Sequence, residues 1–271
     1  METAEAMEIW EKLEIKNDFL FAKVMRDKKI CKALLEGLLQ IEIEDIVYLE
    51  EQKTLDVKKD AKSVRLDVYV EDGNKVFDLE MQTTNKRNLP KRSRYYQGMI
   101  DLNTIEKGES YKKLKESYVV FICTFDPFYQ GKAQYTFENF CLEDRGLKLG
   151  DGTKKVFFNA GGYIHAENEE VREFLKYVNG GTSAHPFVKA IEDKVAQVKM
   201  NKEWRLEYMT LLMREEEIRE EGREEGREEG REEGIKGTVS VLKGLNIPLQ
   251  TILVKIQEQY NLSPEESRKY L

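Results

Sequence analysis

The feature that most constrains this fold is a short segment of alternating residues with a turn at its centre. Residues 65–82 read RLDVYVEDGNKVFDLEMQ. Alternation of apolar and polar residues is typical of a half-buried strand, and Asp-Gly is a strong hairpin signal. We expect the turn to centre on Asp72-Gly73, which places Asp67 opposite Asp78. The pattern therefore predicts an antiparallel hairpin with one apolar face.

The other face of this hairpin carries acidic residues. Because residues two apart share a face, Glu80 and Gln82 join Asp67 and Asp78. Like charges on neighbouring strands destabilise a sheet unless a positive charge neutralises them. Carboxylates on neighbouring strands also lie close enough to bind one divalent cation together. Mg²⁺ prefers oxygen ligands, and the Met81 carbonyl is a further oxygen nearby. The pattern leaves two interpretations open, a metal site and a solvated polar face.

A basic segment follows the second strand directly. Residues 86–94 include five Lys or Arg and no acidic residue. A proline in the first turn predicts a helix over residues 89–106. On a helix, Arg87, Lys91 and Arg94 share a face, and such a face holds the phosphates of a nucleic acid. The alternative interpretation is a solvated basic turn.

The remaining patterns predict an α/β core with a helical C-terminal half. Two helical pieces are expected over residues 17–40, capped by Asn17 or Asp18. Further strands are expected at 47–55, 118–124, 133–143 and 154–160. From about residue 166 the periodicity becomes helical. We therefore expect the core to span residues 1–165.

The acidity of the chain is local. The net charge is −7, of which residues 214–233 contribute −6 through five Arg and eleven Glu. The rest of the chain is close to neutral, so its charge does not exclude a nucleic-acid partner.

Several classes of protein are excluded by composition. Cys31, Cys123 and Cys141 are odd in number and far apart, which argues against a disulfide framework. With His165 and His185 they form no zinc-ligand spacing, and a His-based catalytic triad is not expected. No apolar run approaches the ~18 residues of a membrane span, and the N-terminal residues lack signal-peptide character. We expect a cytoplasmic protein.

These motifs resemble those of a known nuclease family. Asp67 followed by Glu80-x-Gln82 resembles the PD-(D/E)xK motif, with Gln in place of the usual Lys. The runs NDFLFAKVM, RLDVYVEDGNKVFDLEMQ and KRSRYYQGMID are similar to the branch of PD-(D/E)XK nuclease family transposases, also called recombination-promoting nucleases, over residues 15–165. The resemblance implies a restriction-endonuclease-like core, a mixed sheet flanked by helices. It also implies cleavage of DNA with Mg²⁺, for which Mn²⁺ is a substitute.

The resemblance assigns catalytic roles to four acidic or amide residues. Asp67 and Glu80 bind the metal together with the Met81 carbonyl, and Asp18 is an N-terminal acidic partner. Gln82 stands at the lysine position, where it orients water or a phosphate oxygen but carries no charge.

The positive charge that Gln82 lacks is therefore expected from the following helix. Lys91 or Arg94 is the candidate for that charge, and Tyr96 is expected to help hold the site. The motif predicts cleavage and not strand transfer.

The C-terminal half divides into a helical extension at 166–213, a charged repeat at 214–234 and a small helical module at 235–271. The repeat is REEG four times, and each Gly in a helix costs about 1 kcal/mol relative to Ala. Three interpretations of the repeat stay open: a spacer, a helix that pairs with another copy, and an acidic arm that shields the basic helix. In the module, Pro248 and Ser263 are placed to begin helices. Its charge of +2 fits an oligomerisation module at least as well as a helix-turn-helix.

The expected function is a metal-dependent DNA endonuclease, linked to recombination or to mobile-element DNA and self-associating through its C-terminal helices. The alternative is a nuclease fold without activity, which binds DNA or protein through those helices.

Overall fold

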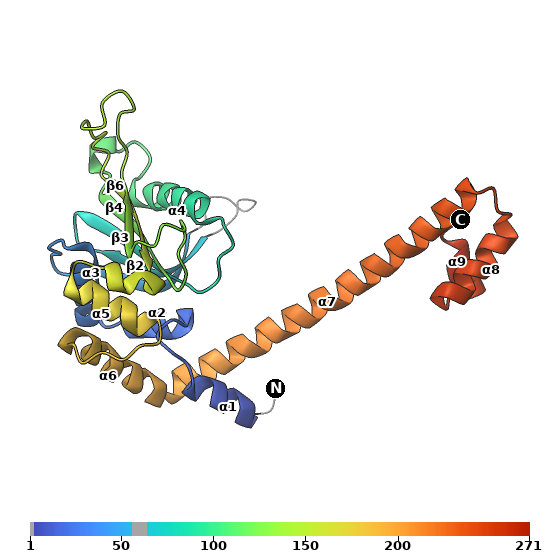
Figure 1. Ribbon diagram of the computed structural model, residues 1–271, viewed down its shortest axis with the longest axis horizontal. Helices are drawn as coiled ribbons and strands as arrows, with labels where there is room; N and C mark the ends of the chain where they lie inside the picture. The colour runs from blue at the N-terminus through green and yellow to red at the C-terminus, as the bar shows by residue number, and fades with distance from the viewer. Residues whose placement is uncertain (1–2, 56–63) are drawn as a thin grey trace. The chain divides into compact units, whose positions relative to one another are not determined.

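The computed structural model describes residues 3–55 and 64–271 (Figure 1). The chain forms two compact units, one up to Leu206 and the other from Glu207 to Leu271. The first unit contains the sheet and the helices that cover it. Its elements are α1 (Thr3–Glu11), α2 (Asp18–Met25), α3 (Lys28–Leu39), β1 (Tyr48–Leu55), β2 (Val64–Glu71), β3 (Lys75–Gln82), α4 (Leu89–Thr104), β4 (Glu116–Cys123), β5 (Gln134–Phe137), β6 (Thr153–Asn159), α5 (Glu169–Val178) and α6 (Pro186–Met200).

The described strands form one mixed sheet of six, in the order β1-β2-β3-β4-β6-β5. The pairs β1–β2, β2–β3 and β5–β6 are antiparallel, whereas β3–β4 and β4–β6 are parallel. The helix α2 packs against β1 to β3, and α4 packs against β4. The predicted fold, a mixed sheet flanked by helices, is confirmed.

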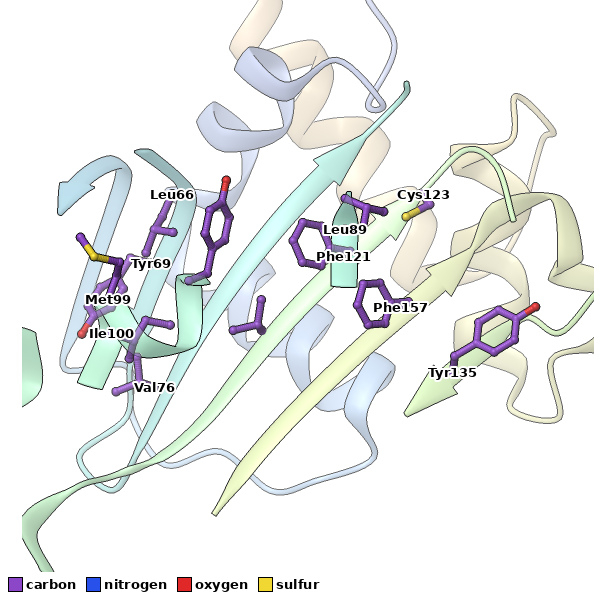
Figure 2. Packing of buried hydrophobic residues seen from close by; sticks show 12 residues of the cluster. Leu66, Tyr69, Val76, Leu89, Met99, Ile100, Phe121, Cys123, Tyr135 and Phe157 are labelled. Carbon is purple, nitrogen blue, oxygen red and sulfur yellow. The ribbon is translucent and has the colours of Figure 1, made fainter. Parts of the chain in front are cut away.

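Aromatic side chains form much of the core between α4 and the sheet (Figure 2). Phe121 of β4 and Phe157 of β6 stack with ring centroids 5.3 Å apart. Tyr96 of α4 stacks on Phe121 from the helix side, at 6.1 Å. Burial of these large rings fixes α4 over the centre of the sheet, on the face that carries the acidic residues of β3.

The hairpin forms, but its register differs from the prediction by two residues. Tyr69, and not Asp67, faces Asp78. The reason lies in the turn, where the Asp72 N–H donates to the Lys75 carbonyl at 3.1 Å and the Lys75 N–H donates to the Asp72 carboxylate at 2.8 Å. These two residues close the turn, so its central residues are Gly73 and Asn74 and not Asp72 and Gly73.

The left-handed φ of +93° at Gly73 suits the first central position of a II′ turn. A shift of two residues preserves the parity of side chains along each strand. The acidic residues therefore stay on one face, as predicted, although each has a different neighbour across the hairpin.

Helix boundaries differ from the predictions in three places. The helix α1 was not predicted. Residue Arg87 lies before α4, whose N-cap is Asn88, so it does not share a helical face with Lys91 and Arg94 as predicted. The helix expected to run from Pro186 into the repeat breaks at Asn201, whose side chain accepts the N–H groups of the next turn.

The second unit consists of the greater part of α7 (Lys202–Gly244), α8 (Leu249–Tyr260) and α9 (Pro264–Arg268). The REEG repeat is helical throughout and exposed from Arg219 to Glu233, and its last residue, Gly234, is half-buried beside Tyr260. Beyond it, Ile235 and Val239 of α7 pack on Ile252 and Ile256 of α8 in a small core. The predicted starts of α8 and α9 are confirmed, and Ser263 forms a complete capping box.

Candidate active site

A groove of about 530 Å³ lies beside the end of β3. Gln82 and the residues that follow it form one wall, and the segment between α1 and α2 forms another. Two acidic residues, Glu14 and Asp18, line the groove together with four basic side chains: Lys12, Lys16, Lys86 and Arg92. Lys16 pairs with Glu14 and Arg92 with Glu80, and the basic side chains still outnumber the acidic ones in the lining. A groove with this lining suits a polyanion whose backbone passes an acidic centre.

Asp67 and Glu80 are joined at the point where the β2–β3 ladder ends. The Met81 N–H donates to Oδ2 of Asp67 at 3.0 Å, and the Asp67 N–H donates to Oε1 of Glu80 at 3.1 Å. Each carboxylate thus replaces a backbone carbonyl as the acceptor of a neighbouring strand's N–H group. These two hydrogen bonds fix the orientations of the Asp67 and Glu80 side chains and hold both on the same face of the sheet.

Arg92 connects this pair to Gln82. From the first turns of α4 its guanidinium donates to Oε2 of Glu80 at 2.9 Å and to Oε1 of Gln82 at 2.7 Å. It also donates to the Tyr96 hydroxyl at 2.7 Å. The Gln82 amide in turn donates to the Met81 carbonyl at 3.0 Å. One positive charge therefore holds the acidic and the amide side chains of the motif in fixed orientations.

The acidic residues of the site are unusually buried. Asp78 and Glu80 are 0% and 1% exposed, which excludes the interpretation of this face as a solvated polar surface. Burial, with repulsion from Asp67, raises the pKa of Asp78 well above its usual range, and burial with repulsion from Asp78 does the same for the pKa of Glu80. Burial also raises the pKa of Asp67 to about 6, against the N–H donated by Met81.

The donors at this site are of the kind that a hard divalent cation prefers, and a bound cation would favour the ionised form of the carboxyl groups, whose pKa values burial raises. Neither carboxyl oxygen of Asp78 has a hydrogen-bond partner of normal geometry among the described residues. Three carboxylates and a backbone carbonyl offer the oxygen ligands that Mg²⁺ prefers, and Mg²⁺ uses only one or two carboxylates, with water completing its shell. No group of three or more His, Cys, Asp or Glu side chains in the described ranges is placed to hold a metal ion, so the protein would supply at most two carboxylates to a cation here. This donor set therefore fits an open site better than a closed one.

The remaining predicted residues lie in different places. Asp18 lines the groove, its Oδ1 accepts the Phe19 N–H at 2.8 Å, and its charge contributes to the raised pKa of Asp67. Lys91 and Arg94 are exposed on α4, and neither is among the residues that line the groove. Arg87 is exposed and lines a separate hollow.

Arg92 is the residue of this candidate site that the sequence interpretation did not single out. Counted among five basic residues, it carried no distinguishing mark by itself. Its spacing of four from Tyr96 was the available signal, because residues i and i+4 share the helical face that turns toward the sheet. Arg92 contacts Gln82 directly, and neither Lys91 nor Arg94 lines the groove.

The thiols do not contribute to this site. Cys123 is buried at the end of β4, and burial raises its pKa to about 12, with the nearby Arg92 opposing that rise. A thiol with such a pKa stays protonated at neutral pH and is not a nucleophile.

A comparison with protein-family models shows to which family the chain belongs. The model for PD-(D/E)XK nuclease family transposases matches residues 15–230. The chain belongs to this family of nuclease-fold proteins. The match extends past the sheet into α7, further than the similarity apparent from the motifs. No curated protein and no solved structure matches the chain. None of the described helices is long and apolar enough to cross a membrane.

Proposed function

We propose that this protein is a metal-dependent DNA endonuclease whose catalytic centre is Asp67, Glu80 and Gln82. The observation that carries the proposal is the coupled placement of Asp67 and Glu80. Each accepts a backbone N–H across the β2–β3 hairpin, and Met81 and Gln82, which follow Glu80, line a groove with four basic side chains. Such a site combines ligands for a cation with positive charge for a phosphodiester backbone.

In this proposal the metal ligands are Asp67, Glu80 and the Met81 carbonyl, with Mg²⁺ as the ion and Mn²⁺ as a substitute. A bound cation supplies Lewis acidity and lowers the pKa of a coordinated water. The rest of the work falls to the chain itself. Asp67 and Glu80 are held rigidly by the N–H groups they accept, so the ligand geometry exists before the cation arrives.

Gln82 and Arg92 take the part that a lysine plays in the usual motif. The amide of Gln82 orients water or a phosphate oxygen, and Arg92 provides the charge that an amide lacks. Asp18 lines the groove and adds negative charge near Asp67. Of the residues first assigned to phosphate, Lys91 and Arg94 contact DNA further along α4 in this proposal, whereas Lys12, Lys16 and Lys86 hold the strand within the groove.

The broader role follows from the family. We infer a function in recombination or in processing mobile-element DNA, in the cytoplasm, with self-association through the second unit. The proposal concerns phosphodiester hydrolysis and makes no claim for strand transfer.

The test is plasmid cleavage by purified protein with and without Mg²⁺ or Mn²⁺. We expect nicked or linear product only with metal, and loss of at least 100-fold in rate for Asp67→Ala and for Glu80→Ala, because removal of a transition-state interaction of about 3 kcal/mol has that effect. Lys29→Ala, an exposed residue of α3, is the matched control and should cleave normally. Cleavage that survives the double substitution of Asp67 and Glu80 would show that the site is elsewhere. Absence of cleavage with any metal, together with intact DNA retardation, would favour a binding module.

A further inference from the structure

A second hollow, of about 300 Å³, lies next to the candidate active site. The loop after β3 separates the two. Thr83, Thr84 and Lys86 line the active-site groove, whereas Asn85 and Arg87 of the same loop line the second hollow. The loop after β4 provides the facing wall, because β3 and β4 are parallel and both end at this edge of the sheet.

The floor of this hollow is rigid and aromatic. The Phe128 ring packs edge-on against Tyr135 and Phe157, with centroids 4.9 and 5.1 Å apart. The Asp126 carboxylate accepts the N–H groups of Phe128 at 2.9 Å and Gly131 at 2.7 Å, which fixes the course of the loop. An apolar floor built in this way exists before any ligand binds.

The rim of the hollow carries an exposed ring, an amide and a guanidinium. Tyr129 is 67% exposed, and the Asn85 amide donates to its hydroxyl at 3.0 Å, which links the two loops. Both Tyr129 and Arg87 have left-handed backbone conformations, with φ of +56° and +53°. Such conformations are uncommon for residues other than glycine. They occur here on the two facing loops, where the Tyr129 ring and the Arg87 guanidinium line the hollow.

We propose that this hollow binds an unpaired nucleobase of the DNA strand whose phosphate lies at Gln82, and this inference rests on the nuclease function proposed above. Aromatic and apolar walls stack any base, and an Asn amide recognises a base edge. Arg87 supplies a cation for the phosphate of the same nucleotide. Asn85 is the third residue after Gln82, a reach of at most about 11 Å, so the hollow serves a nucleotide close to the one that is cleaved.

A base in this hollow cannot remain stacked in a duplex. Enzymes that take a base out of the helix bind single-stranded or locally unpaired DNA more readily, because the cost of unpairing has already been met. The proposal therefore specifies the substrate as DNA with an unpaired segment at the cleavage point.

The experiment measures DNA binding by fluorescence anisotropy in EDTA, so that cleavage does not interfere. The probes are a fluorescein-labelled single-stranded 20-mer, its blunt duplex, and a 20-mer of abasic sites that retains every phosphate. Tyr129→Asn removes the ring and keeps a residue that tolerates the left-handed backbone. Tyr129→Phe keeps the ring. Tyr111→Asn is the matched control, because Tyr111 is 84% exposed on another part of the unit.

We expect the single strand to bind more tightly than the duplex or the abasic strand. Tyr129→Asn should weaken single-strand binding by about five- to 100-fold, to the level of the abasic strand, as loss of base stacking does. Tyr129→Phe and Tyr111→Asn should bind like the natural protein. Equal binding of the abasic and natural strands, or no effect of Tyr129→Asn, would overturn the base-binding site and leave the nuclease function intact. Failure of every probe to bind, with no metal-dependent cleavage, would overturn both proposals.

Discussion

Replacing Asp67 by Asn should stabilise the protein in the absence of metal. The pKa of Asp67 is raised from 3.8 to about 6, with burial as the main cause. A carboxyl group whose pKa is higher in the folded than in the unfolded state makes folding less favourable once it ionises. Asn keeps an oxygen that accepts the Met81 N–H but carries no charge.

The pKa gives the magnitude and the pH window. A rise from 3.8 to about 6 corresponds to about 3 kcal/mol at ~1.4 kcal/mol per tenfold change in the equilibrium constant. Because the side chain is partly exposed and solvent screens its charge, we expect a gain of about 1–3 kcal/mol at pH 8. The folded state binds more protons between the two pKa values, so the stability of the natural protein rises as the pH falls from 6 to 4. The gain from Asn should therefore vanish near pH 4.

Urea denaturation in EDTA at pH 8 and pH 4 measures this difference, with Asp45→Asn as the control because Asp45 is exposed. The control should change the free energy of unfolding by less than about 0.5 kcal/mol. With Mg²⁺ added, the order should reverse, since only the natural protein gains the free energy of metal binding. A lower free energy of unfolding for Asp67→Asn than for the natural protein, in EDTA at pH 8, would refute this prediction. It would mean that the folded protein stabilises the ionised carboxylate of Asp67.

Three further outcomes follow from the contacts described above. Arg92→Gln should destabilise the protein by about 3 kcal/mol or more in urea denaturation and abolish cleavage, because it leaves the buried Glu80 without its ion pair; Lys29→Gln, on the exposed side of α3, should do neither. Alkylation with iodoacetamide should leave Cys123 unmodified in the folded protein and cleavage unchanged, and mass spectrometry showing modification of Cys123 within minutes would contradict its burial. Ser263→Ala should cost about 1 kcal/mol and speed hydrogen exchange in α9 without an effect on the sheet, so faster exchange in β3 would contradict the separation into two units.

Local patterns predicted most of the elements that position the site. Alternation in β2 and β3 placed the acidic residues on one face. That prediction is correct although the turn was misplaced, because a register shift of two residues leaves every side chain on the same face of the sheet. The position of the turn itself depended on the hydrogen bond that the Lys75 backbone N–H donates to the Asp72 carboxylate, which no periodicity reveals. The hydrogen bonds of the turn thus set which residues face each other across the hairpin, whereas the hydrophobic pattern set which face of the sheet each side chain occupies.

Tertiary packing explains what the sequence did not disclose. Arg92 and Lys91 are adjacent and equally basic, and only the packing of α4 on the sheet turns one toward Glu80 and the other to solvent. The burial of Asp78 follows likewise from α4 covering a face that the strand pattern alone would have left to water. Helix formation through the REEG repeat opposes the propensity of its glycines, each of which costs about 1 kcal/mol relative to Ala.

The central claim is that Asp67 and Glu80 hold the cation that supports DNA cleavage. Anomalous diffraction from a crystal soaked in Mn²⁺ tests it most directly. We predict one peak about 2–2.3 Å from carboxylate oxygens of both residues, and its loss in Asp67→Asn. A peak bound elsewhere, or no peak in crystals of protein that cleaves DNA with Mn²⁺, would contradict the account.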